Sequence, residues 1–242
     1  MVNIDDFKST QGRLDPGNHP EALAAWNQFL GNVISPSLVA EILCTGMSAY
    51  EMRNRLAFRL RGKARLAVLV SHPGATPVIA KAERSIDHMA GIVTHDSMRV
   101  IPAWQGRRIG RSLVNNHVNL YIAFGYELVH LVAAGEGGGY AWARAGFEPY
   151  PDEWSQLSQE IENRLVRLAP TVDPDVLNAC KLFLSLGPRE SLWSLADIDQ
   201  TYLGRPLGSL LLRGTRWSGT LNLHDGEALA RLNDWVNREG LT

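Results

Sequence analysis

Three arginines and two glycines follow a short extended segment closely enough to hold an anion. Residues 100–114 read Val-Ile-Pro-Ala-Trp-Gln-Gly-Arg-Arg-Ile-Gly-Arg-Ser-Leu-Val. Pro102 disfavours helix at the residue before it, and a periodic apolar pattern starts at Ile109. The first N–H groups of such a helix carry about half a positive charge, which suits a phosphate. The pattern therefore predicts a phosphate-binding turn between a strand and a helix.

Two well-known phosphate loops do not fit this turn. A Walker loop needs Gly-x-x-x-x-Gly-Lys-Ser/Thr, and a dinucleotide fold needs Gly-x-Gly-x-x-Gly. Gly106 and Gly110 match neither spacing, and no lysine follows them. The two glycines still let the main chain approach a ligand closely.

The hexapeptide Gln105-Gly106-Arg107-Arg108-Ile109-Gly110 resembles the pyrophosphate loop of the GNAT superfamily of N-acyltransferases. That loop is written Gln/Arg-x-x-Gly-x-Gly/Ala and lies between a strand ending in Val-x-Pro and a long helix. The fourth position, commonly glycine in the family, is Arg108 here, which keeps the backbone donors but restricts the conformations available. Residues 140–147, Tyr-Ala-Trp-Ala-Arg-Ala-Gly-Phe, look like the late helix of the family, which typically ends in Gly-Phe after a tyrosine. The resemblance covers about residues 90–150.

The elements around the loop follow in the order that the resemblance requires. Apolar residues at helical spacing predict a helix of about four turns that ends near Gly125. Residues 128–134 form a short apolar run typical of a buried strand, and Gly135 to Gly139 are expected to break it.

The resemblance implies an acyl-coenzyme A co-substrate, with acetyl as the default acyl group and no metal. Its pyrophosphate would lie on the loop amides, and its thioester on main-chain N–H groups of the preceding strand. Arginines at a helix start are unfavourable with the helix dipole, so an anion explains them better than a solvated face, although that alternative stays open. The expected coenzyme-binding residues are Met98, Val100, Gln105, Gly106, Arg107, Arg108, Ile109, Gly110 and Arg111.

A general base in this superfamily often lies nine to twelve residues before the loop, where this chain has His95 and Asp96. Strict strand alternation puts Asp96 on the face of Met98 and His95 on the opposite face, and a bulge would reverse this. His95 has the better ordinary pKa for a base, whereas Asp96 would need a raised pKa or a water. Either residue could instead be a solvated residue at a strand end. His130 is either a core histidine or a polar group beside the substrate.

The expected general acid departs from the family pattern. The position where the family commonly has a tyrosine is Trp142, whose indole cannot transfer a proton. Tyr140 lies about 200° away around a regular helix, so it could protonate the leaving thiolate only if the helix begins later or is irregular. Its alternative is a packed aromatic side chain.

Composition limits the remaining classes. The chain has 242 residues, 45% of them apolar, and a formal net charge of -1, which gives no general electrostatic case for nucleic acid. Two distant cysteines without a metal-like cluster favour a reduced intracellular protein. No signal pattern or apolar run of about 20 residues is present, so a cytoplasmic protein that spans no membrane is expected.

Outside the resemblance, periodicity predicts further elements. Helices are expected at 21–30, 37–44, 154–168, 176–186, 192–198 and 227–238, a hairpin at 56–70, and weaker strands at 78–82 and 89–93. Residues 203–223 have no assignable period. The predicted fold class is α/β (α+β): a GNAT-like mixed, mainly antiparallel central sheet flanked by helices, with a mostly helical C-terminal extension. The predicted domains are a core at 1–150 and an extension at 151–242 that packs on it.

The sequence thus predicts an acyl-coenzyme-A-dependent N-acyltransferase that acylates an amine of a small molecule or peptide by direct aminolysis. One alternative is an enzyme that modifies an aminoacyl-tRNA or nucleotide amine. Another is a non-catalytic module that binds coenzyme A or a peptide, for which Arg108 and Trp142 argue. A homodimer stays open.

Overall fold

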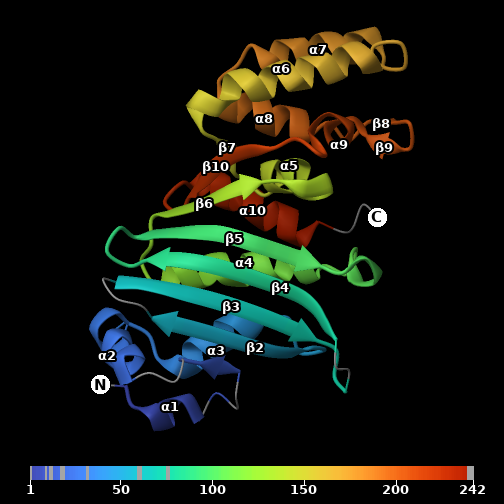
Figure 1. Ribbon diagram of the computed structural model, residues 1–242. Coiled ribbons are helices and arrows are strands. Elements are labelled where there is room, and N and C mark those ends of the chain that lie inside the picture. The colour runs from blue at the N-terminus through green and yellow to red at the C-terminus, as the bar shows by residue number, and fades with distance from the viewer. Residues whose placement is uncertain are drawn as a thin grey trace. The chain divides into compact units, whose positions relative to one another are not determined.

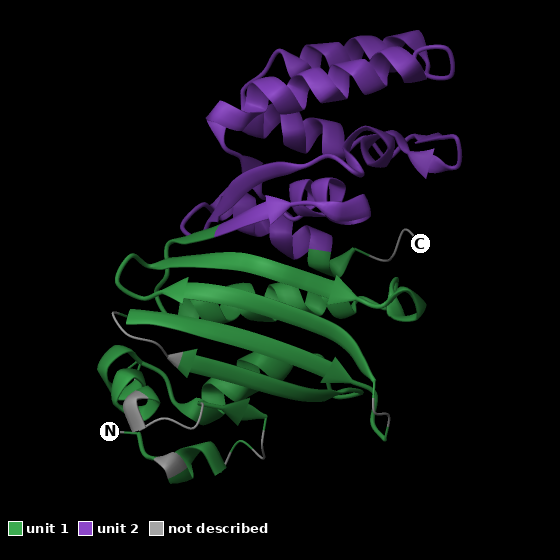
Figure 2. Cartoon of the chain, in the orientation of Figure 1, with its two compact units in different colours: residues 1–129, 236–242 green, residues 130–235 purple. Residues whose placement is uncertain are grey.

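The chain is a mixed α/β protein with an eight-stranded, mostly antiparallel sheet and a mainly helical C-terminal part (Figure 1). The computed structural model describes residues 2–8, 10, 13–16, 20–30, 33–58, 62–74 and 77–238. Two compact units divide the chain (Figure 2): unit 1 comprises residues 1–129 and 236–242, and unit 2 comprises residues 130–235. The predicted domain boundary at residue 150 differs from this division and stays a prediction.

Unit 1 contains a meander of long antiparallel strands. Its strands are β1 Leu14–Asp15, β2 Glu51–Phe58, β3 Lys63–Ser71, β4 Val78–Asp87 and β5 Ile92–Val100, hydrogen-bonded in that order. In β3, buried side chains alternate strictly with more exposed ones: every second residue from Ala64 to Val70 is buried. The short strand β1 pairs in parallel with β2, with Leu14 beside Asn54.

The helices of unit 1 begin where the sequence signals predict, except for the helix at Ile4–Lys8, which was not predicted. They are α1 Ile4–Lys8, α2 Pro20–Phe29, α3 Pro36–Cys44 and α4 Ile109–Ala123. Ser35 caps α3 by accepting a hydrogen bond from the N–H of Leu38, and Pro36 occupies the first turn. Asn116 of α4 donates from Nδ2 to the carbonyls of Leu43 and Thr45, which fixes α4 beside the end of α3.

Unit 2 is mostly helical. Its helices are α5 Gly135–Arg144, α6 Pro151–Leu168, α7 Pro174–Leu184, α8 Pro188–Ala196, α9 Leu207–Leu212 and α10 Gly226–Asn237, whose last two residues belong to unit 1. Strands β6 Leu128–Ala133, β10 Trp217–Asn222 and β7 Glu148–Pro149 follow one another in the sheet, and β8 Thr201–Tyr202 and β9 Arg205–Pro206 form a separate pair. Strand β10 pairs antiparallel to β7, with Gly219 opposite Pro149.

Most predicted helices and the strand at 128–134 are confirmed, and the bounds of the two weak strands need correction. The weak strands at 78–82 and 89–93 are in fact β4 and β5, and residues 88–91 are the turn between them. The segment 203–223 holds α9 and β10, neither of which has a period in the sequence. The predicted hairpin strands are present as β2 and β3, but their turn at 59–61 lies outside the described residues.

No helix in the described part of the chain is long and apolar enough to cross a membrane.

Candidate functional site

A β-bulge at Asp96 sets the geometry of β5. His95 stands opposite Arg84 and Ser97 stands opposite Glu83, so Asp96 is the extra residue on its strand. His95 contacts Tyr121 of α4, and the end of the Met98 side chain lies 3.7 Å from the position of a Cβ built on Gly110. His95 and Met98 therefore share the face that packs on α4. Strict alternation, which puts Asp96 on that face, is wrong because the bulge inserts one residue.

His95 lies in the interior of unit 1. Its Nε2 is 3.3 Å from the Tyr121 hydroxyl, and the ring of His117 lies 6.3 Å away. Burial, followed by the nearby Arg84 and His117, holds the pKa of His95 well below its ordinary value. The ring is therefore neutral at physiological pH. Because only 6% of the His95 side chain is exposed, an amine substrate that enters from the solvent has little access to it.

Asp96 has the opposite environment. Its side chain is exposed, and one carboxylate oxygen accepts a hydrogen bond from the Ser85 hydroxyl at 2.7 Å. Of the two candidate bases, Asp96 is the one that a solvent-borne substrate or water can reach. The choice of base itself stays a prediction.

Arg84, which the sequence analysis does not single out, supports the bulge from inside. Its guanidinium is fully buried, and Nη1 donates to the carbonyls of Glu83 and Ser97 at 2.8 and 2.6 Å. Within the described residues, its Nε and Nη2 have no hydrogen-bond partner. Burial lowers the pKa of Arg84, while Tyr121 and Asp96 oppose that shift. The inward alternation of Ala82, Arg84 and Ile86 is the sequence signal that could have revealed it.

The loop after β5 forms the tight turn expected before α4. A short 3-10 helix, η2 Pro102–Trp104, leads into it, and Gln105 donates from Nε2 to the carbonyl of Val100 at 3.0 Å. Gly106 has a φ of 77°. Arg108 also has a positive φ, 62°, which costs a non-glycine residue about 1–2 kcal/mol. The fourth position of the hexapeptide thus has the backbone conformation that glycine favours.

The start of α4 carries no side-chain cap. Arg108 is the N-cap residue and makes no capping hydrogen bond. The first-turn N–H groups, those of Ile109 and Gly110 among them, have no acceptor within the helix. Gly110 packs without strain, since a Cβ there would meet Met98 and Val100 only at ordinary contact distances of 3.7 and 3.8 Å.

The loop arginines already have partners. Arg108 Nη2 and Arg111 Nη1 donate to the carbonyl of Arg238 at 3.0 and 2.7 Å. Arg107 lies over the ring of Trp104, 4.5 Å from its centroid. Two of the three arginines therefore bind a main-chain oxygen at the end of the chain's last helix. This contact joins residues far apart in sequence, so no local signal could have predicted it.

Helix α5 includes the glycines that were expected to break the strand. It runs without interruption from Gly135, so Tyr140 and Trp142 lie on different sides of a regular helix. The late or irregular helix start that would let Tyr140 take the place of Trp142 is not formed. Tyr140 instead faces the buried Arg144, whose guanidinium lies 5.8 Å from the ring centroid. Its role as an acid stays an untested prediction with weaker support.

A histidine–tyrosine pair in unit 2 is a second place where protons could move. His130 of β6 lies with Nδ1 2.8 Å from the hydroxyl of Tyr150, the residue that precedes α6. Burial lowers the pKa of His130 and raises that of Tyr150, and both side chains remain partly exposed. Tyr150 has no sequence pattern that marks it.

In the part of the chain that the structure describes, no three His, Cys, Asp or Glu side chains form a group that could hold a metal ion. Comparisons with models of protein families, with curated proteins and with solved structures find no match to this chain.

Proposed function

We propose that the protein is an acyl-coenzyme-A-dependent N-acyltransferase of the GNAT type. The observation that carries the proposal is the backbone of the loop: Arg108 adopts a left-handed conformation where the family commonly has glycine, directly before the uncapped α4. The bulged β5 precedes it, and Gly110 lets the helix start approach Met98 and Val100. These features together support a pyrophosphate held by the N–H groups of the first turn.

The proposed reaction is direct aminolysis. The amine nitrogen attacks the thioester carbonyl carbon, the carbon–sulfur bond breaks, and the acyl group passes to nitrogen. Asp96 accepts the proton that the amine loses, directly or through a water, because it is the exposed carboxylate on the strand beside the loop. The coenzyme thiolate then takes a proton, for which Tyr140 is the candidate named from the sequence. Acetyl is the default donor, and a small molecule or peptide supplies the amine.

A module that binds coenzyme A without turnover is the second candidate. The buried, neutral His95 and the regular helix around Tyr140 favour it, since they weaken two of the three proposed catalytic side chains. The two candidates share the loop and differ only in thiol release.

The loop can be tested with two substitutions at one residue. Gly110→Asp places a negative charge at the helix start and should weaken coenzyme A binding at least about tenfold, equivalent to about 1.4 kcal/mol. Gly110→Ala is the matched control, because the added Cβ meets only ordinary contacts. Calorimetry with coenzyme A measures both affinities, and equal affinity for wild type and Gly110→Asp would refute the loop assignment.

Turnover needs a separate measurement. Acetyl-coenzyme A is incubated with the protein and a mixture of amines, and free thiol is followed with a chromogenic thiol reagent. Thiol release that depends on an amine supports the enzyme. Coenzyme A binding without any amine-dependent thiol release supports the binding module instead.

A further inference from the structure

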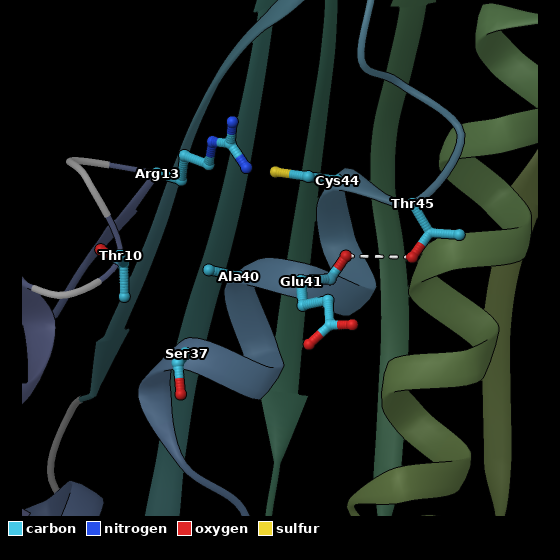
Figure 3. Close-up of a pocket in the computed structure, with 7 residues that line it drawn as sticks. All are labelled: Thr10, Arg13, Ser37, Ala40, Glu41, Cys44 and Thr45. Atoms are coloured by element: carbon cyan, nitrogen blue, oxygen red, sulfur yellow. Dashed lines mark hydrogen bonds between the residues drawn. The ribbon is translucent and has the colours of Figure 1, made fainter.

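Unit 1 has an open cleft of about 350 Å³ beside α3 that belongs to none of the features described above. Figure 3 shows it between α3 and the segment that leads into β1, with the Arg13 guanidinium directed toward Cys44. A volume of this size lies at the lower end of the range for small-molecule sites. The cleft is lined by Thr10, Arg13, Ser37, Ala40, Glu41, Cys44 and Thr45.

Two opposite charges line the cleft without pairing. Arg13 and Glu41 are both exposed, and among the described residues neither makes an ion pair. A cation and an anion that face one cavity but do not contact each other can each take an opposite charge from a ligand. A ligand with a carboxylate and an ammonium group would pair with both.

The hydroxyl groups around the cleft are already engaged. Thr10 donates to the carbonyl of Phe7 at 2.6 Å, Thr45 donates to the carbonyl of Glu41 at 3.0 Å, and the Ser37 hydroxyl lies 3.0 Å from that of Ser35. These contacts fix the walls. The strongest uncommitted polar groups are therefore the two charged side chains.

Hydrogen bonds from Asn54 hold the main chain of Arg13 in place. Asn54 of β2 is buried, and both its N–H and its Nδ2 donate to the carbonyl of Arg13, at 3.1 and 2.8 Å. The same Nδ2 lies 3.7 Å from the Cys44 sulfur. The side-chain amide of Asn54 thus positions both the main chain of Arg13 and the thiol of Cys44. This side of the cleft is therefore held by buried contacts.

We propose that this cleft binds a small zwitterion of the α-amino acid class, with the ligand carboxylate on Arg13 and the ligand ammonium group on Glu41. The inference rests on unpaired charges in one cavity and does not depend on acyl transfer. Because both charges are exposed, each contact is worth at most about 1 kcal/mol, and the two together correspond to a dissociation constant of tens of millimolar.

Cys44 supplies the readout. The chain has two cysteines; Cys44 is half-buried in the cleft wall, whereas Cys180 is fully buried and burial raises its pKa to about 11. Iodoacetamide should therefore alkylate Cys44 first, and Cys180 reports any unfolding. Each proteinogenic L-amino acid except cysteine, whose thiol would consume the reagent, is tested separately, without coenzyme A, for slower alkylation of Cys44 by mass spectrometry.

The charged groups are then tested one at a time. For an amino acid that protects Cys44, Arg13→Ala and Glu41→Gln should each weaken protection about three- to fivefold, the equivalent of about 1 kcal/mol. The amino acid amide, which lacks the carboxylate, should bind wild type and Arg13→Ala equally. The deaminated acid should likewise bind wild type and Glu41→Gln equally.

Arg53→Ala and Glu51→Gln, at exposed β2 residues outside the cleft, are matched controls. In both variants the amino acid should protect Cys44 from alkylation as well as it does in wild type. The proposal is overturned if no amino acid slows alkylation of Cys44. It is equally overturned if the cleft variants and the control variants protect alike, or if removing the ligand's carboxylate leaves the effect of Arg13→Ala unchanged.

Discussion

Replacing His117 by glutamine should make the stability of unit 1 less dependent on pH. The His117 side chain is fully buried on α4, and its Nδ1 donates to the carbonyl of Leu113 one turn earlier. Its Nε2 has no partner among the described residues. Burial, and then the neighbouring Arg84 charge, lower its pKa from 6.5 to about 3.

The sign of the effect follows from where the proton binds. Between pH 6.5 and about 3 the histidine is protonated in the unfolded chain and neutral in the folded one. The unfolded state therefore binds more protons, and stability falls as the pH falls through this window. A pH of about 5 lies about 1.5 units below the ordinary value, so at about 1.36 kcal/mol per unit His117 alone costs about 2 kcal/mol. That is a large share of a typical stability of about 5–15 kcal/mol.

Two other histidines act in the same direction. Burial lowers the pKa of His95 and also lowers that of His88, to about 4. Wild type should thus lose more stability on acidification than His117 alone accounts for. His117→Gln should keep the share that comes from His95 and His88.

The assay is urea unfolding near neutral pH and near pH 5, read by amide exchange of peptides from β4 and β5. A local readout is needed because a chain of two compact units need not unfold in one step. His72→Gln, an exposed histidine of the same unit, is the control and should retain the wild-type pH dependence. If His117→Gln lost as much stability on acidification as wild type, the buried neutral state of His117 would be refuted.

Backbone conformation and close packing give two further predictions, both measured by urea unfolding with amide exchange of peptides from α4 or α5 as the local readout. The free energy of unfolding of Arg108→Gly should stay within about 1 kcal/mol of wild type, because relief of the strain at the left-handed residue offsets the entropy that glycine loses on folding. Arg108→Val should be less stable than Arg108→Gly. Equal stability of the two variants would contradict the strain. Gly139→Ala should destabilise by about 1–3 kcal/mol, because a Cβ there would lie 2.1 Å from the Thr215 hydroxyl. Gly137→Ala in the same helix meets open space and should stabilise by about 0.8–1 kcal/mol, so matching effects at the two glycines would count against the packing.

Local signals made the loop and its helix predictable. Pro102, the two loop glycines and the apolar period up to Gly125 act within a few residues, and Gly125 does end α4 with a φ of 74°. The bulge at Asp96 depends on how β5 pairs with β4 and on the buried Arg84 across the strands. No property of the residues around Asp96 alone specifies it.

Two glycines of unit 2 show what the sequence patterns could not reveal there. Gly135 to Gly139 follow the end of β6, as expected, but they also form the first half of α5, and Gly139 is required there because a side chain would collide with Thr215. Gly219 lies within β10, where a Cβ would come 2.1 Å from the carbonyl of Glu148 on the paired strand. Both glycines are required by neighbours distant in sequence, so the residues around them could not show that they lie within regular elements.

An anion bound at the loop would compete with the Arg238 carbonyl for Arg108 and Arg111. Arg108 and Arg111 stand at the positive end of α4, where cations are unfavourable, and the Arg238 carbonyl offers them a partial negative charge. A hydrogen bond from a charged group to a neutral carbonyl is worth about 1.5–3 kcal/mol at best, and less where water competes, as at the exposed Arg108 and the half-buried Arg111. The proposed pyrophosphate carries full charges and would also reach the N–H groups of Ile109 and Gly110 at the start of α4, which has no side-chain cap. The observed contact is therefore compatible with the proposed ligand, which would replace the carbonyl as the partner of the two arginines.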